Sequence, residues 1–385
     1  MNNNIKKVCV VINSRANYGR IKTFLQSAQK SKKIELQIVV GASALLHRFG
    51  KVIDIIKADG FQPNARLYSI VEGETPITMA KSTGLGIIEL STIFYNLKPD
   101  IVLTVADRFE TLSTAVASSY MNIPLAHTQG GEVTGSIDES VRHAITKLSH
   151  IHFPATKKAE QNVIRMGENP KTVFNVGCPS IDAIANIDLK LSKDFFVKNK
   201  GVGIKINQDK PYLVILQHPV TTEYGKGFFQ IEQTLKAIES IKMQTVWLWP
   251  NIDAGSDDIS KGLRMYREKY NPDYIHFYKN FEVQDYARLI NNCKCLIGNS
   301  SSAIREGSFL GVPAVNIGTR QNGREMEKNI INVDYNSTHI EDAIKKQLIN
   351  GKYDSSKLYG DGKAGEKIVK ILEDAKINIQ KQLPY

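Results

Sequence analysis

The sequence is poor in cysteine and contains no long apolar run. Only four of its 385 residues are cysteines. No stretch approaches the roughly eighteen consecutive apolar residues that a membrane-spanning helix needs, so the sequence excludes such a helix. The polar, basic start Met1–Lys7 is followed by a short apolar stretch, Val8–Ile12, which is too short for the core of a signal peptide. We therefore expect a cytoplasmic protein with no membrane partner.

The cysteines are scattered along the chain at Cys9, Cys178, Cys293 and Cys295. This low density argues against a disulfide framework and favours buried thiols. Cys293 and Cys295 lie in a predicted strand, and no second pair of Cys or His stands at ligand spacing. We therefore expect no metal site.

A block of basic residues is also missing, although the formal net charge is +11. Lys and Arg are spread along the chain, and neither zinc-finger spacing nor an RNA-binding sheet signature occurs. The pattern indicates a lysine-rich, solvated surface whose positive potential attracts an anionic substrate. It argues against a nucleic-acid partner.

What the sequence does contain is a regular alternation of short apolar runs with amphipathic segments. Such alternation predicts an α/β protein with parallel, doubly wound sheets, and 385 residues suit two domains. The first series of predicted strands is Lys7–Asn13, Ile34–Val40, Ile101–Val105, Pro124–Thr128 and Val173–Val176. The second series is Tyr212–Leu216, Thr245–Trp249, Tyr274–Phe277, Cys295–Gly298, Ala314–Ile317 and Ile330–Val333.

The alternation lapses over the polar, lysine-rich segment Asp188–Lys210, which we interpret as the connection between domains. The predicted domains are residues 1–190 and 205–365, each Rossmann-like, and Ala364–Gln382 is predicted as a final helix. Ligands of such sheets bind at the carboxyl ends of the strands. We therefore expect a central cleft and look for polar motifs just after predicted strands.

The strongest polar motif is Gly298-Asn-Ser-Ser-Ser-Ala-Ile-Arg-Glu306, between a predicted strand and a helix predicted over Ala303–Leu310. Free N–H groups and hydroxyls in such a turn suit an anion. N-capping needs only one serine, so the row Ser300, Ser301 and Ser302 favours a phosphate site. Glu306 is either a capping carboxylate or a ligand of a ribose, and both roles stay open.

Two further loops offer cations. The loop Gly318–Glu325 follows a predicted strand and carries Arg320 and Arg324, which suit bidentate anion recognition. Arg15 follows the first strand in a loop without the three-glycine turn of a dinucleotide site, and it is either a phosphate ligand or a surface arginine. The literal G-x-G-x-x-G at Gly360–Gly365 lacks a preceding strand and is expected to cap the last helix.

The candidates for proton transfer are Asp107, Glu132, Asp138 and His218, which lie in loops after predicted strands. Helix capping is the alternative role for Asp107, which precedes Arg108, and for Asp138. Glycines around Glu132 are expected to let the backbone approach a ligand. Neither G-x-S-x-G nor a Walker lysine loop occurs. The sequence therefore favours acid–base chemistry on a bound sugar over acyl transfer or nucleoside-triphosphate hydrolysis.

Five segments together resemble the UDP-N-acetylglucosamine 2-epimerase family, in particular its hydrolysing branch. They are, in order, Gly130–His150, Leu216–Thr222, Pro250–Ser256, Gly298–Ser302 and Gly318–Glu325. The resemblance runs from Arg15 to Gly362, nearly the whole chain. It implies a glycosyltransferase-B-like fold in which a helix over residues 366–385 packs back on the first domain. We also expect a homodimer or homotetramer.

The resemblance also implies a reaction without metal or redox cofactor. A base removes the C2 proton of UDP-N-acetylglucosamine while UDP leaves from C1, and water adds to the 2-acetamidoglycal to release N-acetylmannosamine for sialic-type acid biosynthesis. The alternative is the same reaction on UDP- or GDP-linked N,N'-diacetylbacillosamine. A glycosyltransferase and a non-catalytic nucleotide-sugar binder are further alternatives.

Family positions suggest individual roles. Asp107 and Asp138 match proton-transfer positions, whereas Gln129 stands where many relatives carry a glutamate, so Glu132 or Asp138 is expected to cover that role. Glu306 is expected to hold the ribose and Phe281 to lie by the base. The full set of expected nucleotide-sugar ligands is Arg15, Arg108, His218, Asn251, Asp253, Phe281, Ser300, Ser301, Ser302, Glu306 and Arg320.

Overall fold

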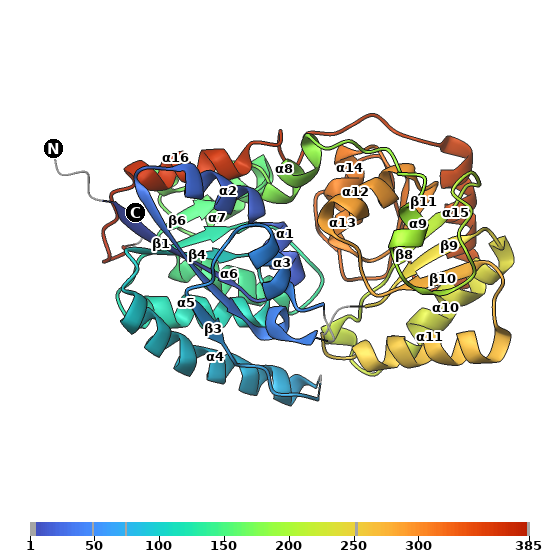
Figure 1. The fold of residues 1–385 in the computed structure, drawn as a ribbon, viewed down its shortest axis with the longest axis horizontal. Coiled ribbons are helices and arrows are strands. Elements are labelled where there is room, and N and C mark those ends of the chain that lie inside the picture. The colour runs from blue at the N-terminus through green and yellow to red at the C-terminus, as the bar shows by residue number, and fades with distance from the viewer. Residues whose placement is uncertain (1–4, 48–49, 74, 251–252, 383–385) are drawn as a thin grey trace. The chain divides into compact units, whose positions relative to one another are not determined.

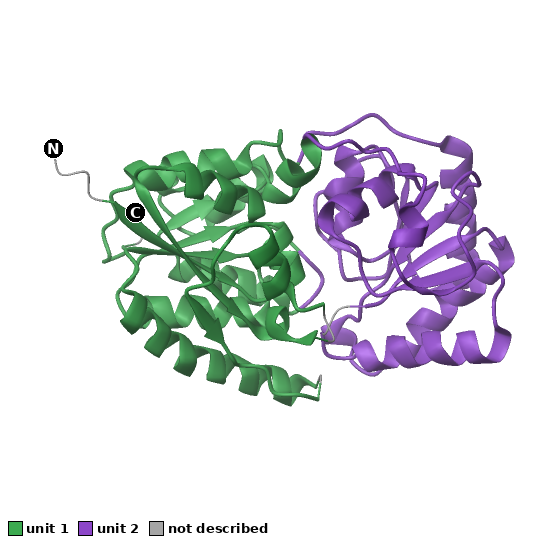
Figure 2. Cartoon of the chain, in the orientation of Figure 1, with its two compact units in different colours: residues 1–133, 137–185, 359–385 green, residues 134–136, 186–358 purple. Residues whose placement is uncertain are grey.

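The computed structural model describes residues 5–47, 50–73, 75–250 and 253–382. The chain forms two compact units, each built around one sheet with helices on both faces (Figure 1). Unit 1 comprises residues 1–133, 137–185 and 359–385, and unit 2 comprises residues 134–136 and 186–358 (Figure 2). The C-terminal segment thus belongs to the same unit as the N-terminal strand.

The sheet of unit 1 has six parallel strands in the order β3-β2-β1-β4-β5-β6. Their bounds are β1 Lys6–Ile12, β2 Ile34–Gly41, β3 Ala65–Leu67, β4 Ile101–Val105, β5 Leu125–Thr128 and β6 Ile151–Phe153. Every residue of β4 is buried, because helices cover both faces of the sheet. This is why the central strands appear in the sequence as unbroken apolar runs.

Two helical layers enclose this sheet. The helices of unit 1 are α1 Arg15–Gly19, α2 Lys22–Lys30, α3 Val52–Ala58, α4 Pro76–Leu97, α5 Phe109–Tyr120, α6 Asp138–Leu148, α7 Lys157–Arg165, α8 Pro179–Ala185 and α16 Ala364–Asp374. On one face, Phe24 of α2 and Ile368 of α16 pack in one core cluster. On the other face, Leu90 of α4, Ala115 of α5 and Ile145 of α6 form a second.

Unit 2 repeats the plan with seven strands in the order β13-β12-β11-β8-β9-β10-β7, of which only β7 is antiparallel to its neighbour. The strands are β7 Val202–Gly203, β8 Leu213–Leu216, β9 Thr245–Leu248, β10 Ile275–Tyr278, β11 Cys295–Gly298, β12 Ala314–Ile317 and β13 Ile330–Val333. The helices are α9 Phe195–Lys198, α10 Gly227–Ile241, α11 Ser256–Tyr270, α12 Val283–Asn292, α13 Ser301–Ile304, α14 Glu306–Phe309 and α15 Ser337–Asn350.

Several elements of unit 1 differ from the sequence prediction, and the three-residue strand β3 was missed. The predicted strand Val173–Val176 is wrong, since Val173 forms only an isolated bridge with His152. The last strand of the sheet is instead β6, which has only three residues and was missed. The final helix ends at Asp374 rather than Gln382, because the ammonium group of Lys6 donates to the carbonyls of Leu372 at 3.0 Å and Ala375 at 2.6 Å and so caps the helix end.

The segment after α16 is held on unit 1 by Lys381. Its ammonium group donates to the carbonyl oxygens of Lys147 at 2.8 Å and Ser149 at 2.7 Å, at the C-terminal end of α6. It also lies 2.5 Å from the carboxylate of the buried Glu168, which His152 contacts at 3.0 Å. Burial opposes ionisation of Glu168, but hydrogen bonds from His152, Lys147 and Lys381 outweigh it and lower the pKa of Glu168 to about 2.

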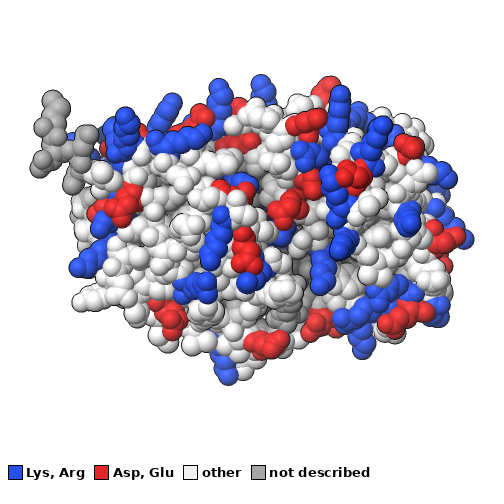
Figure 3. All heavy atoms as spheres, viewed as in Figure 1, with Lys and Arg blue, Asp and Glu red and all other residues white. Residues whose placement is uncertain are grey.

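None of the described helices is long and apolar enough to cross a membrane. On the face shown in Figure 3, Lys and Arg side chains are spread widely, with Asp and Glu among them. All four cysteines lie within the described residues, where they are buried and form no disulfide.

The depressed pKa of Glu168 predicts an acid-sensitive contribution to the stability of unit 1. Its folded pKa lies below the ordinary value of 4.5, so the stabilisation is present above pH 4.5 and is lost as the pH falls towards 2. Glu168→Gln should lower the free energy of unfolding by about 2–3 kcal/mol at pH 7, and the difference from wild type should shrink between pH 4.5 and 3. Urea titrations followed by far-UV circular dichroism measure this.

The chain contains an internal control for that experiment. Both tryptophans, Trp247 and Trp249, lie in unit 2, so their fluorescence reports chiefly on that unit and should change little in the variant. A stability loss of equal size at every pH would contradict the predicted role of the Glu168 charge.

Candidate functional site

Three loops of unit 1 leave the sheet at the carboxyl ends of the adjacent strands β1, β4 and β5. They begin at Asn13, Ala106 and Gln129. Because neighbouring parallel strands end at the same edge, these loops lie beside one another, where open α/β sheets bind ligands. The predicted residues Asp107, Gln129 and Glu132 are on these loops. Arg15, predicted in the loop after the first strand, is instead the first residue of α1, and Asp138 begins α6, the helix that follows the third loop.

The guanidinium of Arg142 on α6 joins these loops. Its side chain is 1% exposed, and its Nε donates to a carboxylate oxygen of Asp107 at 3.0 Å, with a second close contact from Nη2. Its Nη1 donates to the main-chain oxygen of Glu132 at 2.6 Å and to the carboxylate of Glu139 at 2.8 Å. Arg142 was not among the functional residues predicted from the sequence. Its position four residues after Asp138 on the same predicted helix was the available signal.

The Arg142 contacts determine the charge state of this edge. Burial lowers the pKa of Arg142, but the negative charges of Asp107, Glu132 and Glu139 outweigh burial and raise it, so the group stays a cation. A carboxylate that accepts two donors from a guanidinium is held in its ionised form. Asp107 is therefore held as a carboxylate, the form that can accept a proton.

Helix capping does not explain the two aspartates. The N-cap residue of α5 is Arg108, one position after Asp107. The N-cap residue of α6 is Ile137, and Asp138 is the first helical residue, half-buried. The Arg108 guanidinium contacts the buried Glu110 of its own helix at 3.2 Å.

Gln129 is held at both ends of its amide. Its nitrogen donates to the sulfur of Cys178 at 3.2 Å, and its oxygen accepts from Arg20 at 3.3 Å. The residue is buried, and its φ of 64° turns the chain sharply after β5. An amide cannot exchange a proton as a carboxylate does, so these contacts suit Gln129 to orient neighbouring groups.

The glycines beside Gln129 have a different role from the predicted one. A Cβ atom on Gly131 would lie 2.1 Å from the carbonyl oxygen of Ala159 on α7, and one on Gly130 would lie 3.0 Å from the Thr146 hydroxyl on α6. These glycines therefore let the loop pack on the helices of unit 1 itself. The expectation that they approach a ligand is not supported.

In unit 2 the corresponding edge is formed by the loops after the adjacent strands β8, β11 and β12. Gly298 ends β11 with a φ of 125°, and a Cβ atom there would lie 2.2 Å from the carbonyl oxygen of Leu216. Only glycine fits this turn. The turn therefore lies directly against the end of β8, next to His218.

The side chain and backbone of the buried Asn299 tie the three loops together. Its amide oxygen accepts from the main-chain N–H of His218 at 2.7 Å, and its amide nitrogen donates to the His218 carbonyl at 2.8 Å. The main-chain carbonyl oxygen of Asn299 accepts hydrogen bonds from the side chains of Arg320 at 3.2 Å and Gln321 at 2.8 Å. Asn299 therefore sets the backbone of the His218 loop and the position of the Arg320 side chain. The sequence showed Asn299 only as a member of the Gly298–Glu306 motif and gave no sign of this role.

The serine turn forms a chain of hydroxyl groups. Ser300 is the N-cap of α13, and its hydroxyl lies 3.0 Å from that of Ser302. The Ser302 hydroxyl in turn lies 2.6 Å from the hydroxyl of Tyr286, whose pKa is raised by burial. Tyr286 was missed because it comes from α12, an element without a polar motif.

The single helix predicted after this turn over Ala303–Leu310 is interrupted. The chain forms two four-residue helices, α13 and α14, which meet at Arg305. Helices this short contribute little macrodipole. Anion binding at this edge would therefore rest on the serine hydroxyls and the Arg320 guanidinium.

Three further predicted ligands of unit 2 lie among the described residues. The Arg320 guanidinium lies 3.8 Å from the carboxylate of Asp253, and one carboxylate oxygen of Glu306 is buried with no hydrogen-bond partner among the described residues. The ring of Phe281 stacks on Phe195, with ring centroids 5.7 Å apart. Asn251 lies outside the described residues.

The two edges offer different chemistry. Unit 1 presents carboxylates organised around one buried cation, which suits proton transfer. Unit 2 presents hydroxyls, an arginine and a carboxylate oxygen without a partner, which suit a diphosphate and a pair of sugar hydroxyls.

Comparison with known proteins identifies the family. The family model for UDP-N-acetylglucosamine 2-epimerase matches residues 26–373. The chain is 33% identical to UDP-N,N'-diacetylbacillosamine 2-epimerase (hydrolyzing) of Legionella pneumophila, over 98% of each chain. It is 29% identical to UDP-N-acetylglucosamine 2-epimerase of Neisseria meningitidis, over 93% of this chain and 92% of the relative.

Solved structures show the same fold. The UDP-GlcNAc 2-epimerase of Methanocaldococcus jannaschii, solved in complex with UDP-GlcNAc and UDP, superposes with a TM-score of 0.78 at 20% identity, and the match covers 95% of this chain and 99% of that one. The predicted architecture of two Rossmann-like sheets of the glycosyltransferase-B type is confirmed.

The Asn299 contacts predict a loss of ligand affinity on truncation. Asn299→Ala removes both hydrogen bonds to the His218 backbone and keeps the main-chain carbonyl that Arg320 and Gln321 contact, so it tests the order of the His218 loop. Binding of UDP, the ligand expected at this edge, should weaken by about 10–100-fold in isothermal titration calorimetry.

Asn329→Ala is the matched control for this prediction. Asn329 is also buried in unit 2, where it accepts from the Ser308 hydroxyl at 2.8 Å and donates to the Val312 carbonyl at 2.7 Å, away from the three loops. It should reduce stability but leave UDP affinity nearly unchanged. Equal affinity losses in both variants would show that Asn299 acts only through stability.

Proposed function

The chain belongs to the UDP-N-acetylglucosamine 2-epimerase family, and from this membership we propose that it is a hydrolysing 2-epimerase converting UDP-N-acetylglucosamine and water to N-acetylmannosamine and UDP. The observation that carries the proposal is the buried Arg142, which holds the Asp107 carboxylate beside the helix that Asp138 begins. A reaction that removes and returns a carbon-bound proton needs carboxylates held in this way.

The first step is an elimination. Asp107 accepts the C2 proton, the C2–H electron pair forms the C1–C2 double bond, and the C1–O bond breaks with both electrons leaving on UDP. We assign proton removal to Asp107 because its two contacts with Arg142 hold it as a carboxylate. The second step adds water across the double bond: the hydroxyl of water joins C1 and its proton passes to solvent, while Asp138 or Glu132, in its protonated form, delivers a proton to the opposite face of C2. Asp107 then returns its proton to solvent, and the carboxylate that acted as the acid takes one up, so that the site is restored. Gln129 orients these groups without exchanging a proton.

Departure of UDP requires stabilisation of the negative charge that develops on its phosphate. The hydroxyls of Ser300 and Ser302, the N–H groups of the serine turn and the Arg320 guanidinium supply donors at the edge of unit 2. We assign the buried, unpartnered oxygen of Glu306 to the ribose hydroxyls, because a carboxylate is the natural acceptor for a vicinal diol. Arg15, Arg108, His218, Ser301, Asp253 and Phe281 complete the proposed ligand set.

A second substrate is favoured by one observation. The relative at 33% identity over 98% of each chain is named for N,N'-diacetylbacillosamine rather than for N-acetylglucosamine. The same elimination and hydration apply to that sugar, since the chemistry at C1 and C2 is shared. The UDP- or GDP-linked diacetylated sugar is therefore our alternative substrate, on the route to legionaminic acid.

The proposal predicts release of a free sugar without an acceptor. Incubation with UDP-N-acetylglucosamine should yield UDP and N-acetylmannosamine, and in D₂O the product should carry deuterium at C2, because that carbon is reprotonated from solvent. UDP- and GDP-linked N,N'-diacetylbacillosamine run alongside identify the preferred substrate by kcat/KM. No nucleotide release from any of them would exclude the proposed activity and leave a binder or a glycosyltransferase.

The acid–base assignment predicts a separation of turnover from binding. Asp107→Asn and Asp138→Asn should each lower kcat by about 10²–10⁴-fold while UDP affinity is largely kept. Arg320→Ala should weaken UDP affinity as well, and the exposed Asp54→Asn serves as control. Near-normal turnover in both carboxamide variants would rule out the assigned pair.

A further inference from the structure

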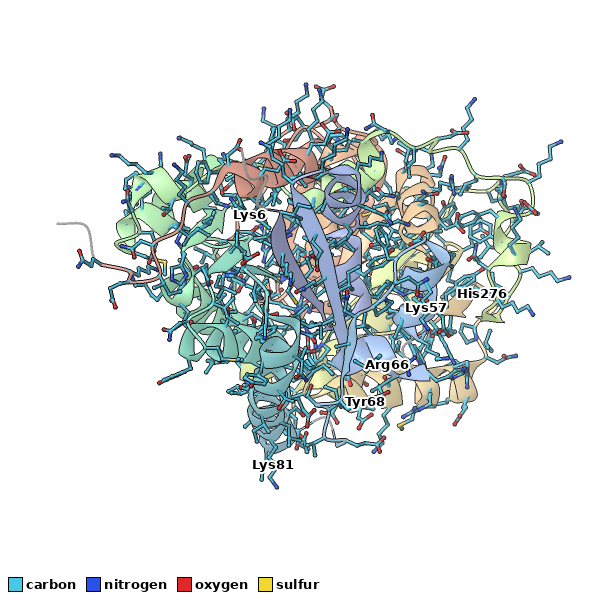
Figure 4. All side chains as sticks on the ribbon, turned by 60° about the vertical axis from the view of Figure 1, so that its left-hand side comes forward. Lys6, Lys57, Arg66, Tyr68, Lys81 and His276 are labelled. Carbon is cyan, nitrogen blue, oxygen red and sulfur yellow. The ribbon has the colours of Figure 1, made fainter. Side chains whose placement is uncertain are left out.

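Strand β5 of unit 1 carries a buried histidine, His127, that the proposed reaction does not use. Many polar side chains of unit 1 reach solvent, as the exposed Lys81 does where it extends away from the body of the unit (Figure 4). His127, by contrast, is 0% exposed. Burial lowers its pKa to about 3, and its hydrogen bond to Ala106 offsets this shift only in part. The imidazole is therefore neutral near pH 7, with one N–H donor and one acceptor.

The His127 ring lies between two elements of the proton-transfer edge. Its Nε2 atom lies 2.9 Å from the main-chain oxygen of Ala106, and because a carbonyl oxygen only accepts, Nε2 carries the proton. The Nδ1 atom is then an acceptor, and it faces the hydroxyl of Thr146 at 3.4 Å. Thr146 lies on α6 one turn after Arg142, and its hydroxyl donates to the Arg142 carbonyl at 3.0 Å. The ring therefore contacts both the residue before Asp107 and the helix that carries Arg142.

The backbone of Ala106 is strained and needs contacts that hold it. Its φ is 65°, in the left-handed region that a residue with a Cβ atom rarely adopts. Its methyl group is buried in a core cluster of unit 1. A strained conformation of this kind persists only where the surrounding structure fixes it. Ala106 directly precedes Asp107, so this turn of the chain decides where the Asp107 carboxylate points.

The residue before Ala106 is also held by buried side chains. The carbonyl oxygen of Val105, which ends β4, accepts from the amide of Asn17 at 3.3 Å and from the hydroxyl of Thr111 at 3.3 Å. Asn17 on α1 and Thr111 on α5 are each 2% exposed. Two successive carbonyls at the end of β4 thus accept from side chains of three different elements. Hydrogen bonds of this kind, and not only the sheet, fix the chain as it enters the Asp107 loop.

The loop after β5 leaves room for the His127 ring. A Cβ atom on Gly130 would lie 3.1 Å from Nδ1 and 3.4 Å from Cε1 of His127. Both distances are shorter than an ordinary van der Waals contact between such atoms, so a side chain at position 130 would press on the imidazole. The glycine therefore allows the ring to keep its hydrogen bond to Ala106.

We propose that His127 is a positioning residue, whose hydrogen bond to Ala106 fixes the backbone that places the Asp107 carboxylate on Arg142. The inference rests on the proposed function, in which Asp107 accepts the C2 proton. His127 acts through the main chain and touches neither the sugar nor the reacting atoms. Proton transfer depends steeply on the position of the accepting group, so a small shift of the Asp107 carboxylate would lower turnover.

Two substitutions at position 127 test this role. His127→Leu keeps a buried side chain but removes the donor to Ala106, so kcat should fall by about 10–100-fold while the UDP dissociation constant in isothermal titration calorimetry stays within about twofold of wild type. His127→Gln offers an amide N–H in place of the Nε2 proton and should return kcat to within about fivefold of wild type. Unchanged kcat in His127→Leu, or the same loss in both variants, would contradict the proposal.

His152→Leu is the matched control. His152 is the register partner of His127 on β6 and is also 0% exposed, but its ring contacts the carboxylate of Glu168 at 3.0 Å. This variant should lose stability and keep kcat within about twofold of wild type. If it lost as much turnover as His127→Leu, the effect at position 127 would be one of stability alone and the positioning role would be wrong.

A double-mutant cycle needs no turnover and so separates this inference from the proposed function. Asp107→Asn should lower the urea midpoint of unfolding, because it weakens the pairing of the buried Arg142. In the His127→Leu background, where the carboxylate is already displaced, the same substitution should shift the midpoint by about half as much, and in the His152→Leu background by the full amount. Additive shifts with His127→Leu would overturn the positioning role even in an active enzyme. Coupled shifts in a protein that turns over no substrate would support it and reject only the proposed function.

Discussion

The edge of unit 1 depends on one buried cation. An unpaired guanidinium in a protein interior is very costly, so Arg142 requires negative partners wherever it is placed. It takes Asp107 from the loop after β4, the main-chain oxygen of Glu132 from the glycine-containing loop, and Glu139 from its own helix. The demand for compensation therefore brings these segments together. The position and ionised state of Asp107 follow from that demand.

In unit 2 the loops at the strand ends are held together by hydrogen bonds of Asn299. The side-chain amide of Asn299 forms hydrogen bonds with the main-chain N–H and carbonyl of His218. The main-chain carbonyl of Asn299 accepts hydrogen bonds from the side chains of Arg320 and Gln321. Buried polar groups must find partners, and here that requirement orders three loops at adjacent strand ends. The serine hydroxyls linked to Tyr286 extend the same network. The two units thus hold reactive groups in place by different means, one by charge and one by hydrogen bonds.

Most of the fold and part of the site could be predicted from the sequence. The strands β4 and β11 were predicted with their observed bounds, because buried parallel strands appear as short apolar runs. The prediction was wrong where a local pattern was outweighed by contacts from elsewhere. The last helix stops where Lys6 caps it, and the helix after the serine turn breaks at Arg305. Val173–Val176 is apolar but forms one bridge only.

Alone, the sequence determined the class of fold, most of the strands and helices, and the site loops that follow strand ends, because these depend on periodicity and local chemistry, whereas the three-residue strands β3 and β6 were missed. It also carried the family resemblance. Only the tertiary structure decided that Asp107 pairs with Arg142 and is not the cap of a helix, and that Asn299 and Tyr286 contact the residues of the serine turn and of the His218 loop. Each of these depends on residues distant in the chain, whose contacts are set by how the elements pack and not by their spacing.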